Sequence, residues 1–163
     1  ACEGAELDRP AVLEDLRQAL YASKICAYAQ GFNLLEEAGK VYGWDLQMGR
    51  IAKIWRSGCI IRARFLDTVS EIFEKESSMT NLLASGYFSQ VLYGARAGWG
   101  RIISLAVERG AAVPALSSAL AYFDSYRTAR GSANLLQAQR DCFGAHTYER
   151  IDKEGAFHTD WMN

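Results

Sequence analysis

The chain has 163 residues, of which 50% are hydrophobic and 23% charged, and its formal net charge is −1. This is the composition of one globular domain large enough to bury a core. A charge so close to zero gives no broad attraction to nucleic acid or to an anionic membrane surface, and no apolar run approaches the roughly 20 residues of a membrane span. The first residues also lack the apolar stretch of a signal peptide, so we expect a cytoplasmic protein; Ala1 suggests a processed N-terminus.

The cysteines predict neither disulfides nor a metal site. They are widely scattered, with no CxxC pair and no histidine at ligand spacing. We expect reduced thiols, with Cys26 and Cys59 buried as small hydrophobic residues. The four positions are Cys2, Cys26, Cys59 and Cys142.

The chain is predicted to be all-α: a multi-helix domain with one long central helix and an extended C-terminal tail. Asp8 and Pro10 are typical of a helix start, and Gly43 is typical of a helix end. Between them run two apolar stripes at helical spacing, which together make a face too wide for a surface helix. We therefore expect this helix to lie centrally. One stripe is Leu13, Leu16, Leu20, Ala27, Gly31, Leu34, Ala38 and Val41, and the other is Tyr21, Ile25, Tyr28, Phe32, Leu35 and Tyr42.

The same periodicity predicts shorter helices along the rest of the chain. The expected ranges are about 45–55 with Asp45 as its cap, 58–76, 87–109, 114–130 and 134–143. Residues 8–143 would form the helical domain. Residues 144–163 would form a tail that docks on a partner subunit, because this segment has no periodicity and yet is rich in aromatic residues.

Arg140 and His146 are the candidate binding residues. They lie on either side of a predicted helix end, where a guanidinium and an imidazole can both face one anion. The alternative is that Arg140 pairs with Asp141 or Glu149 on the surface and that His146 only caps the helix.

Two other patterns favour structural roles. The basic residues at 50, 53, 56, 62 and 64 do not share one helix face, which favours a solvated surface with ion pairs such as Arg64–Asp67 over an anion groove. The glycines at 94, 98 and 100 lie within a predicted helix, which favours close helix packing over a nucleotide loop.

Four long segments resemble the decarboxylating 6-phosphogluconate dehydrogenase family, in the order in which that family has them. They are LYASKICAYAQGF from Leu20, IAKIWRSGCIIRARFL from Ile51, ALAYFDSYR from Ala119 and QAQRDCFGAHTYERIDKEGAFHTDW from Gln137. The resemblance covers Asp8 to the end of the chain and only the C-terminal part of the family's helical domain. Cys142 departs from it, since an aromatic residue is common there.

The resemblance implies an NADP-dependent enzyme of the pentose phosphate pathway that converts 6-phosphogluconate to ribulose 5-phosphate. It implies a homodimer in which Arg140 and His146 of one subunit bind the substrate phosphate in the other subunit's active site. The family's catalytic lysine and glutamate and its NADP-binding domain have no counterpart in these residues, so the chain alone is expected to be inactive, with no catalytic, cofactor-binding or metal-binding residue. The alternatives are a free-standing helical dimerisation or regulatory module that has lost catalysis, and a phosphosugar-binding module.

Overall fold

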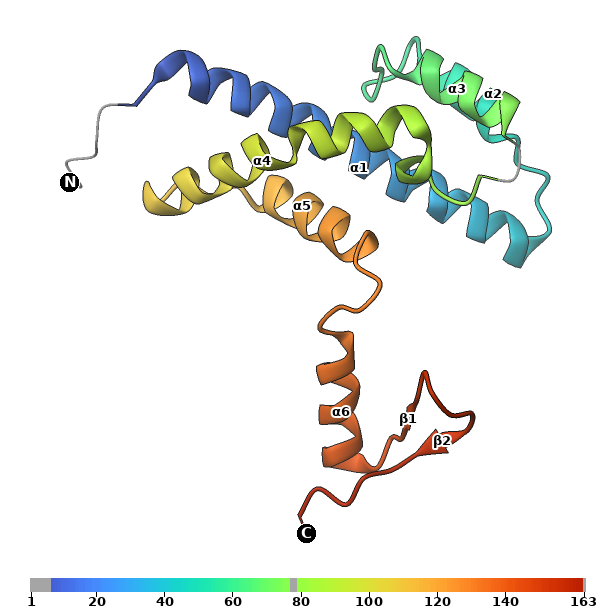
Figure 1. Cartoon of the computed structure of the whole chain (residues 1–163). Helices are drawn as coiled ribbons and strands as arrows, with labels where there is room; N and C mark the ends of the chain where they lie inside the picture. Colours follow the sequence, from blue (N-terminus) through green and yellow to red (C-terminus); the bar gives the residue numbers. More distant parts are fainter. Residues whose placement is uncertain (1–6, 77–78, 163) are drawn as a thin grey trace. The chain divides into compact units, whose positions relative to one another are not determined.

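The computed structural model describes residues 7–76 and 79–162, and over this range the regular secondary structure is helical apart from one short hairpin (Figure 1). The predicted all-α class is confirmed. The described residues form two compact units, divided after Phe123. The first unit contains α1 (Arg9–Tyr42), α2 (Met48–Trp55), α3 (Leu66–Lys75), the 3-10 helix η1 (Leu82–Ala84), α4 (Gly86–Glu108) and most of α5 (Pro114–Tyr126). The second contains α6 (Ala133–Gly144), β1 (Tyr148–Glu149) and β2 (Ala156–Phe157).

The long helix α1 begins and ends where the sequence predicts. The Asp8 side chain accepts a hydrogen bond from Ala11 N, Pro10 lies in the first turn, and Gly43 ends the helix with a left-handed φ of 68°. Such a φ suits glycine, which has no Cβ to clash with the preceding carbonyl. Helix α4 lies alongside α1 (Figure 1), and the two make the most extensive helix–helix contact of the first unit.

Only one of the two apolar stripes of α1 is buried by this chain. Ile25 and Phe32 are 1% and 2% exposed, and they belong to the stripe that meets the rest of the core. The other stripe is largely open, with Leu34 and Val41 71% and 74% exposed. Among the described residues no element covers most of this second stripe. Gly31, on that open side, has nothing within 4 Å of a Cβ position.

Helices α2 and α3 differ from the predicted ranges. Asp45 does not cap α2, whose N-cap is Gln47 without a side-chain hydrogen bond. A helix is present within the predicted range 58–76, but its predicted start is wrong: Gly58 has a left-handed φ of 70°, turns follow it, and α3 begins only at Leu66. Ile61, which lies in these turns, is exposed.

Helices α4 and α5 complete the core of the first unit. Ser85 caps α4 by accepting from Phe88 N. Trp99 is fully buried, and its indole Nε1 donates to Leu116 O at 3.1 Å. Helix α5 begins at Pro114 as predicted and ends at Tyr126, four residues earlier than expected.

Among the α4 glycines at 94, 98 and 100, close packing against another helix is confirmed at Gly98. A Cβ on Gly98 would lie 2.5 Å from Asp15 Oδ1 of α1, whereas Gly94 has nothing within 4 Å. The contact at Gly98 places the Asp15 carboxylate beside Arg101, which donates to it through two nitrogens at 2.6 and 2.7 Å.

Candidate functional site

The predicted anion-binding residues lie at the C-terminal end of α6 and just beyond it. The helix ends at Gly144, and Ala145 follows in the left-handed region with a φ of 50°, donating from its N–H to Asp141 O at 2.8 Å. His146 is therefore not the cap of this helix. The chain then reverses, and strands β1 and β2 pair as an antiparallel hairpin with Tyr148 opposite Phe157.

Arg140 is exposed, and no carboxylate of the described residues neutralises its charge. Its Nη1 donates to Gln137 Oε1 at 3.1 Å, and it forms no ion pair with the rest of residues 7–76 and 79–162. The alternative pairing with Asp141 or Glu149 is not what the structure shows. A guanidinium that holds only a neutral amide keeps most of its donors available for an anion.

His146 is also exposed, and its ring folds back over the end of α6. The ring Nε2 lies 3.0 Å from the place that a Cβ on Gly144 would occupy. Gly144 thus provides the space into which the imidazole fits. The ring makes no hydrogen bond to the other described residues, so both nitrogens are available to a ligand.

Asp141, which the sequence analysis assigned only to a possible surface pair, is the buried centre of the second unit. It is 0% exposed and is the only buried residue between positions 124 and 162. Its Oδ1 accepts from Thr147 N at 2.9 Å and lies 2.9 Å from His158 Nδ1. Its Oδ2 accepts from Thr159 N at 3.0 Å and from Trp161 Nε1 at 2.9 Å.

Three of these four contacts come from N–H groups that can only donate, which favours an ionised carboxylate. An ionised carboxylate only accepts, and it has about four lone-pair positions, so the four donors satisfy it fully and His158 carries its proton on Nδ1. Desolvation raises the pKa of the Asp141 carboxyl, but the hydrogen bonds from Thr159, His158 and Trp161 outweigh it and hold that pKa well below its usual range.

Thr147 connects this carboxylate to the predicted site. Its φ is 59°, a left-handed conformation that is rare for a β-branched residue and costs roughly 1–2 kcal/mol. Both of its backbone groups are held by α6: its N–H donates to Asp141 Oδ1, and its carbonyl accepts from Gln137 Nε2 at 2.6 Å. Gln137 and Asp141 lie one helical turn apart on the same face.

Asp141, Gln137 and His158 were not predicted from the sequence as site residues. The available signal was the composition of the tail, which brings a histidine and a tryptophan, both nitrogen donors, within four residues of each other in a segment with no helical period. The acceptor for these donors was not predictable from spacing, because it lies 17 and 20 residues earlier in the chain.

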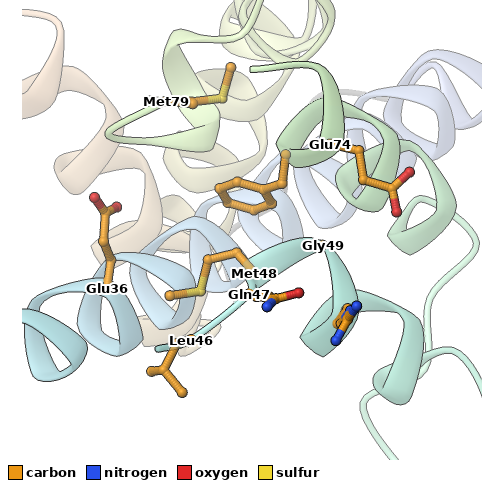
Figure 2. A pocket seen from close by; sticks show the side chains of 9 residues that line it. Glu36, Leu46, Gln47, Met48, Gly49, Glu74 and Met79 are labelled. Carbon is orange, nitrogen blue, oxygen red and sulfur yellow. The ribbon is translucent and has the colours of Figure 1, made fainter. Parts of the chain in front are cut away.

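Two hollows in the structure do not contain the predicted residues. One, of about 570 Å³, lies between α6 and the hairpin and is lined in part by Arg130, Tyr148 and Trp161, but not by Arg140 or His146. The other, of about 430 Å³, is shown in Figure 2, where Glu36 and Glu74 lie on opposite sides with the Met48 side chain between them. Glu74 binds Lys53, which keeps the pKa of that carboxyl low. Neither hollow brings together an acid, a base and a nucleophile.

Two of the five basic residues near α2 form ion pairs. Lys53 pairs with Glu74, and Arg56, rather than Arg64, pairs with Asp67. Arg62 and Arg64 are exposed. The interpretation of this segment as a solvated face is therefore supported. The predicted ion pair Arg64–Asp67 is wrong, because Asp67 pairs with Arg56 instead.

The cysteines are free where the structure describes them. Cys26 is fully buried, and burial raises the pKa of its thiol to about 12. Cys59 is only half-buried and Cys142 is exposed, whereas Cys2 lies outside the described residues. Over residues 7–76 and 79–162, no cluster of three metal-binding side chains occurs, and no helix has the length and apolarity of a membrane span.

Comparison with known proteins identifies the family. Residues 2–161 match the model of the 6-phosphogluconate dehydrogenase C-terminal domain. A decarboxylating 6-phosphogluconate dehydrogenase from Oryza sativa is 51% identical over 96% of this chain, and the NADP(+)-dependent enzyme of Bacillus subtilis is 55% identical over 93% of it. The chain spans 32% of the length of each of these two relatives.

A solved structure agrees with this comparison. The 6-phosphogluconate dehydrogenase of Plasmodium falciparum, whose description includes complexes with NADP+ and with 6-phosphogluconate, superposes with a TM-score of 0.91 at 39% identity. The match covers 97% of this chain and 34% of that one. This chain belongs to the 6-phosphogluconate dehydrogenase family, of which it represents the C-terminal domain.

Proposed function

We propose that the chain is the C-terminal part of a cytoplasmic, NADP-dependent enzyme that oxidatively decarboxylates 6-phosphogluconate to ribulose 5-phosphate. The chain spans about a third of its relatives, so its own contribution is not the whole reaction. NADP would be bound, and hydride and proton transfer would occur, in the part of the enzyme outside these residues. Some relatives are chloroplastic, so cell fractionation tests the proposed location.

The proposed contribution of this chain is to bind the substrate phosphate with Arg140 and His146. The observation that carries this is that both side chains are exposed at one end of α6, and that Arg140 is not paired with a carboxylate among the described residues. A guanidinium offers a planar pair of donors to phosphate oxygens, and an imidazole adds a further donor.

We place this contact in the active site of a second subunit. The second unit has no apolar core of its own, since its only buried residue in the described range 124–162 is Asp141. Its large apolar side chains are exposed: Leu135, Leu136, Phe143, Ile151, Trp161 and Met162. A segment of this size without a core needs another surface to cover these side chains. A second copy of the enzyme provides that surface in a homodimer, and the open stripe of α1 is available to the same assembly.

The phosphate assignment is tested by replacing Arg140 in the full-length enzyme. Arg140→Ala should raise KM for 6-phosphogluconate at least tenfold, equivalent to about 1.4 kcal/mol or more, because a charge-assisted contact to the phosphate is lost. KM for NADP should change little. Arg109→Ala, at an exposed arginine next to the end of α4, is the matched control for loss of one positive charge. An unchanged KM for 6-phosphogluconate in Arg140→Ala would refute the assignment.

A further inference from the structure

A buried carboxylate, Asp141, lies next to the proposed phosphate ligands in the chain. Arg140 and His146 are both exposed; Arg140 stands on α6, whereas His146 follows the end of that helix. The backbone just after His146, between α6 and β1, is held at Thr147 in a left-handed conformation. Without an external restraint this backbone would relax, because a β-branched residue disfavours that conformation.

The restraint comes from two side chains of α6. Asp141 accepts from the Thr147 N–H at 2.9 Å, and Gln137 donates to the Thr147 carbonyl at 2.6 Å. Gln137 also accepts from Arg140 at 3.1 Å. These hydrogen bonds therefore hold both the backbone of Thr147, the residue after His146, and the guanidinium of Arg140.

The remaining lone pairs of Asp141 hold the last segment of the chain. Thr159 N and Trp161 Nε1 donate to Oδ2, and His158 Nδ1 donates to Oδ1. The Tyr148 hydroxyl of β1 also hydrogen-bonds to Thr159 Oγ1, with 2.6 Å between the two oxygens. This bond links the first strand to the same C-terminal segment. Because four donors from the tail meet at one buried anion, the tail is ordered on α6 without an apolar core.

We propose that Asp141 is a positioning residue for the substrate-phosphate site, and that its carboxylate, fixed by His158, Thr159 and Trp161, holds Thr147 so that His146 and Arg140 face the same anion. This inference rests on the proposed function of Arg140 and His146. Asp141 and its three C-terminal donors contact no substrate in this account; they act through the backbone at Thr147 and through Gln137.

The decisive variant is Asp141→Asn in the full-length enzyme. An asparagine has the same shape, but its NH2 group always meets an N–H donor: Thr147 N at the Oδ1 position, or Thr159 N and Trp161 Nε1 at the Oδ2 position. We expect KM for 6-phosphogluconate to rise at least tenfold, with kcat within about threefold of the wild type and KM for NADP unchanged. Amide hydrogen exchange at Thr147 and Thr159 should become faster in the same variant.

A pair of variants at His158 separates positioning from general loss of structure. His158→Asn keeps a nitrogen donor close to the place of Nδ1, and His158→Leu does not. His158→Leu should raise KM for 6-phosphogluconate, whereas His158→Asn should leave KM close to the wild-type value. If Asp141→Asn does not assemble into a dimer, this pair decides the question: equal KM values for the two His158 variants would overturn the inference.

The outcome also separates this inference from the proposed function. An increased KM in Arg140→Ala together with an unchanged KM in both Asp141→Asn and His158→Leu would overturn the role of Asp141 alone. An unchanged KM in Arg140→Ala would overturn the phosphate assignment itself.

Discussion

At the scale of single residues, the candidate site combines an exposed arginine and an exposed histidine with one buried anion. Arg140 and His146 could be singled out from the sequence, because they lie on either side of a helix end marked by Gly144. The buried anion could not, because its burial results from donors that come from residues 158–161. An aspartate beside an exposed arginine is usually a surface residue, and only the fold of the tail makes this one an exception.

Gly144 provides a direct test of the position of His146. Gly144→Ala would place a Cβ 3.0 Å from His146 Nε2, so the ring must move. We expect KM for 6-phosphogluconate to rise about threefold or more because the donor is displaced. Stability should be unchanged or higher by about 0.5–1 kcal/mol, because alanine suits a helix better than glycine. Gly94→Ala, with open space around its Cβ position, is the control that should leave KM unchanged.

The depressed pKa of Asp141 predicts how the tail responds to acid. A carboxyl whose pKa is lower in the folded state stabilises that state at any pH above its unfolded pKa of about 3.9, and this stabilisation is lost as the pH falls below that value. Trp161 fluorescence of the wild type should therefore change on acidification below about pH 4. Asp141→Asn should lack this component, and an identical acid profile for the two proteins would contradict the account.

At the scale of elements, the sequence predicts long regular helices well and irregular segments poorly. Helix α1 has an acidic cap, a proline in its first turn and a terminal glycine, and all three act as predicted. The segment after Gly58 continues the helical spacing of apolar residues, yet it forms turns until α3 begins at Leu66. Periodicity does not reveal such a break, because the glycine alone is compatible with both structures.

The contact between α1 and α4 is sensitive to one glycine. A Cβ on Gly98 would lie 2.5 Å from Asp15 Oδ1, so Gly98→Ala must displace the carboxylate that Arg101 binds. We expect a loss of about 1–3 kcal/mol in the free energy of unfolding, measured in urea. Gly94→Ala in the same helix should be neutral or stabilising. Equal effects of the two substitutions would mean that the close approach at Gly98 is not needed.

At the scale of the whole molecule, we propose that two exposed apolar surfaces of the chain are covered in a larger assembly. These surfaces are the open stripe of α1 and the apolar side chains around α6, and contiguous exposed apolar patches are typical of interaction sites. The sequence predicted both stripes of α1, but not which one the rest of the chain would cover. The chain's 18.1 kDa is also about a third of the mass expected for its relatives. The intact mass of the native protein separates an 18 kDa module from a complete dehydrogenase.

The most direct test of the central claim, that Arg140 acts in the other subunit's active site, is the activity of mixed dimers of the full-length enzyme. One subunit carries Arg140→Ala, and the other keeps Arg140 but is inactivated in its NADP-binding domain. Activity is measured at 6-phosphogluconate concentrations near the wild-type KM, where neither homodimer is efficient. Sharing across the dimer predicts that mixing restores sites with a wild-type KM, because the intact Arg140 of the inactivated subunit completes its partner's site. No restoration in confirmed heterodimers would show that Arg140 acts within its own subunit and would contradict the account.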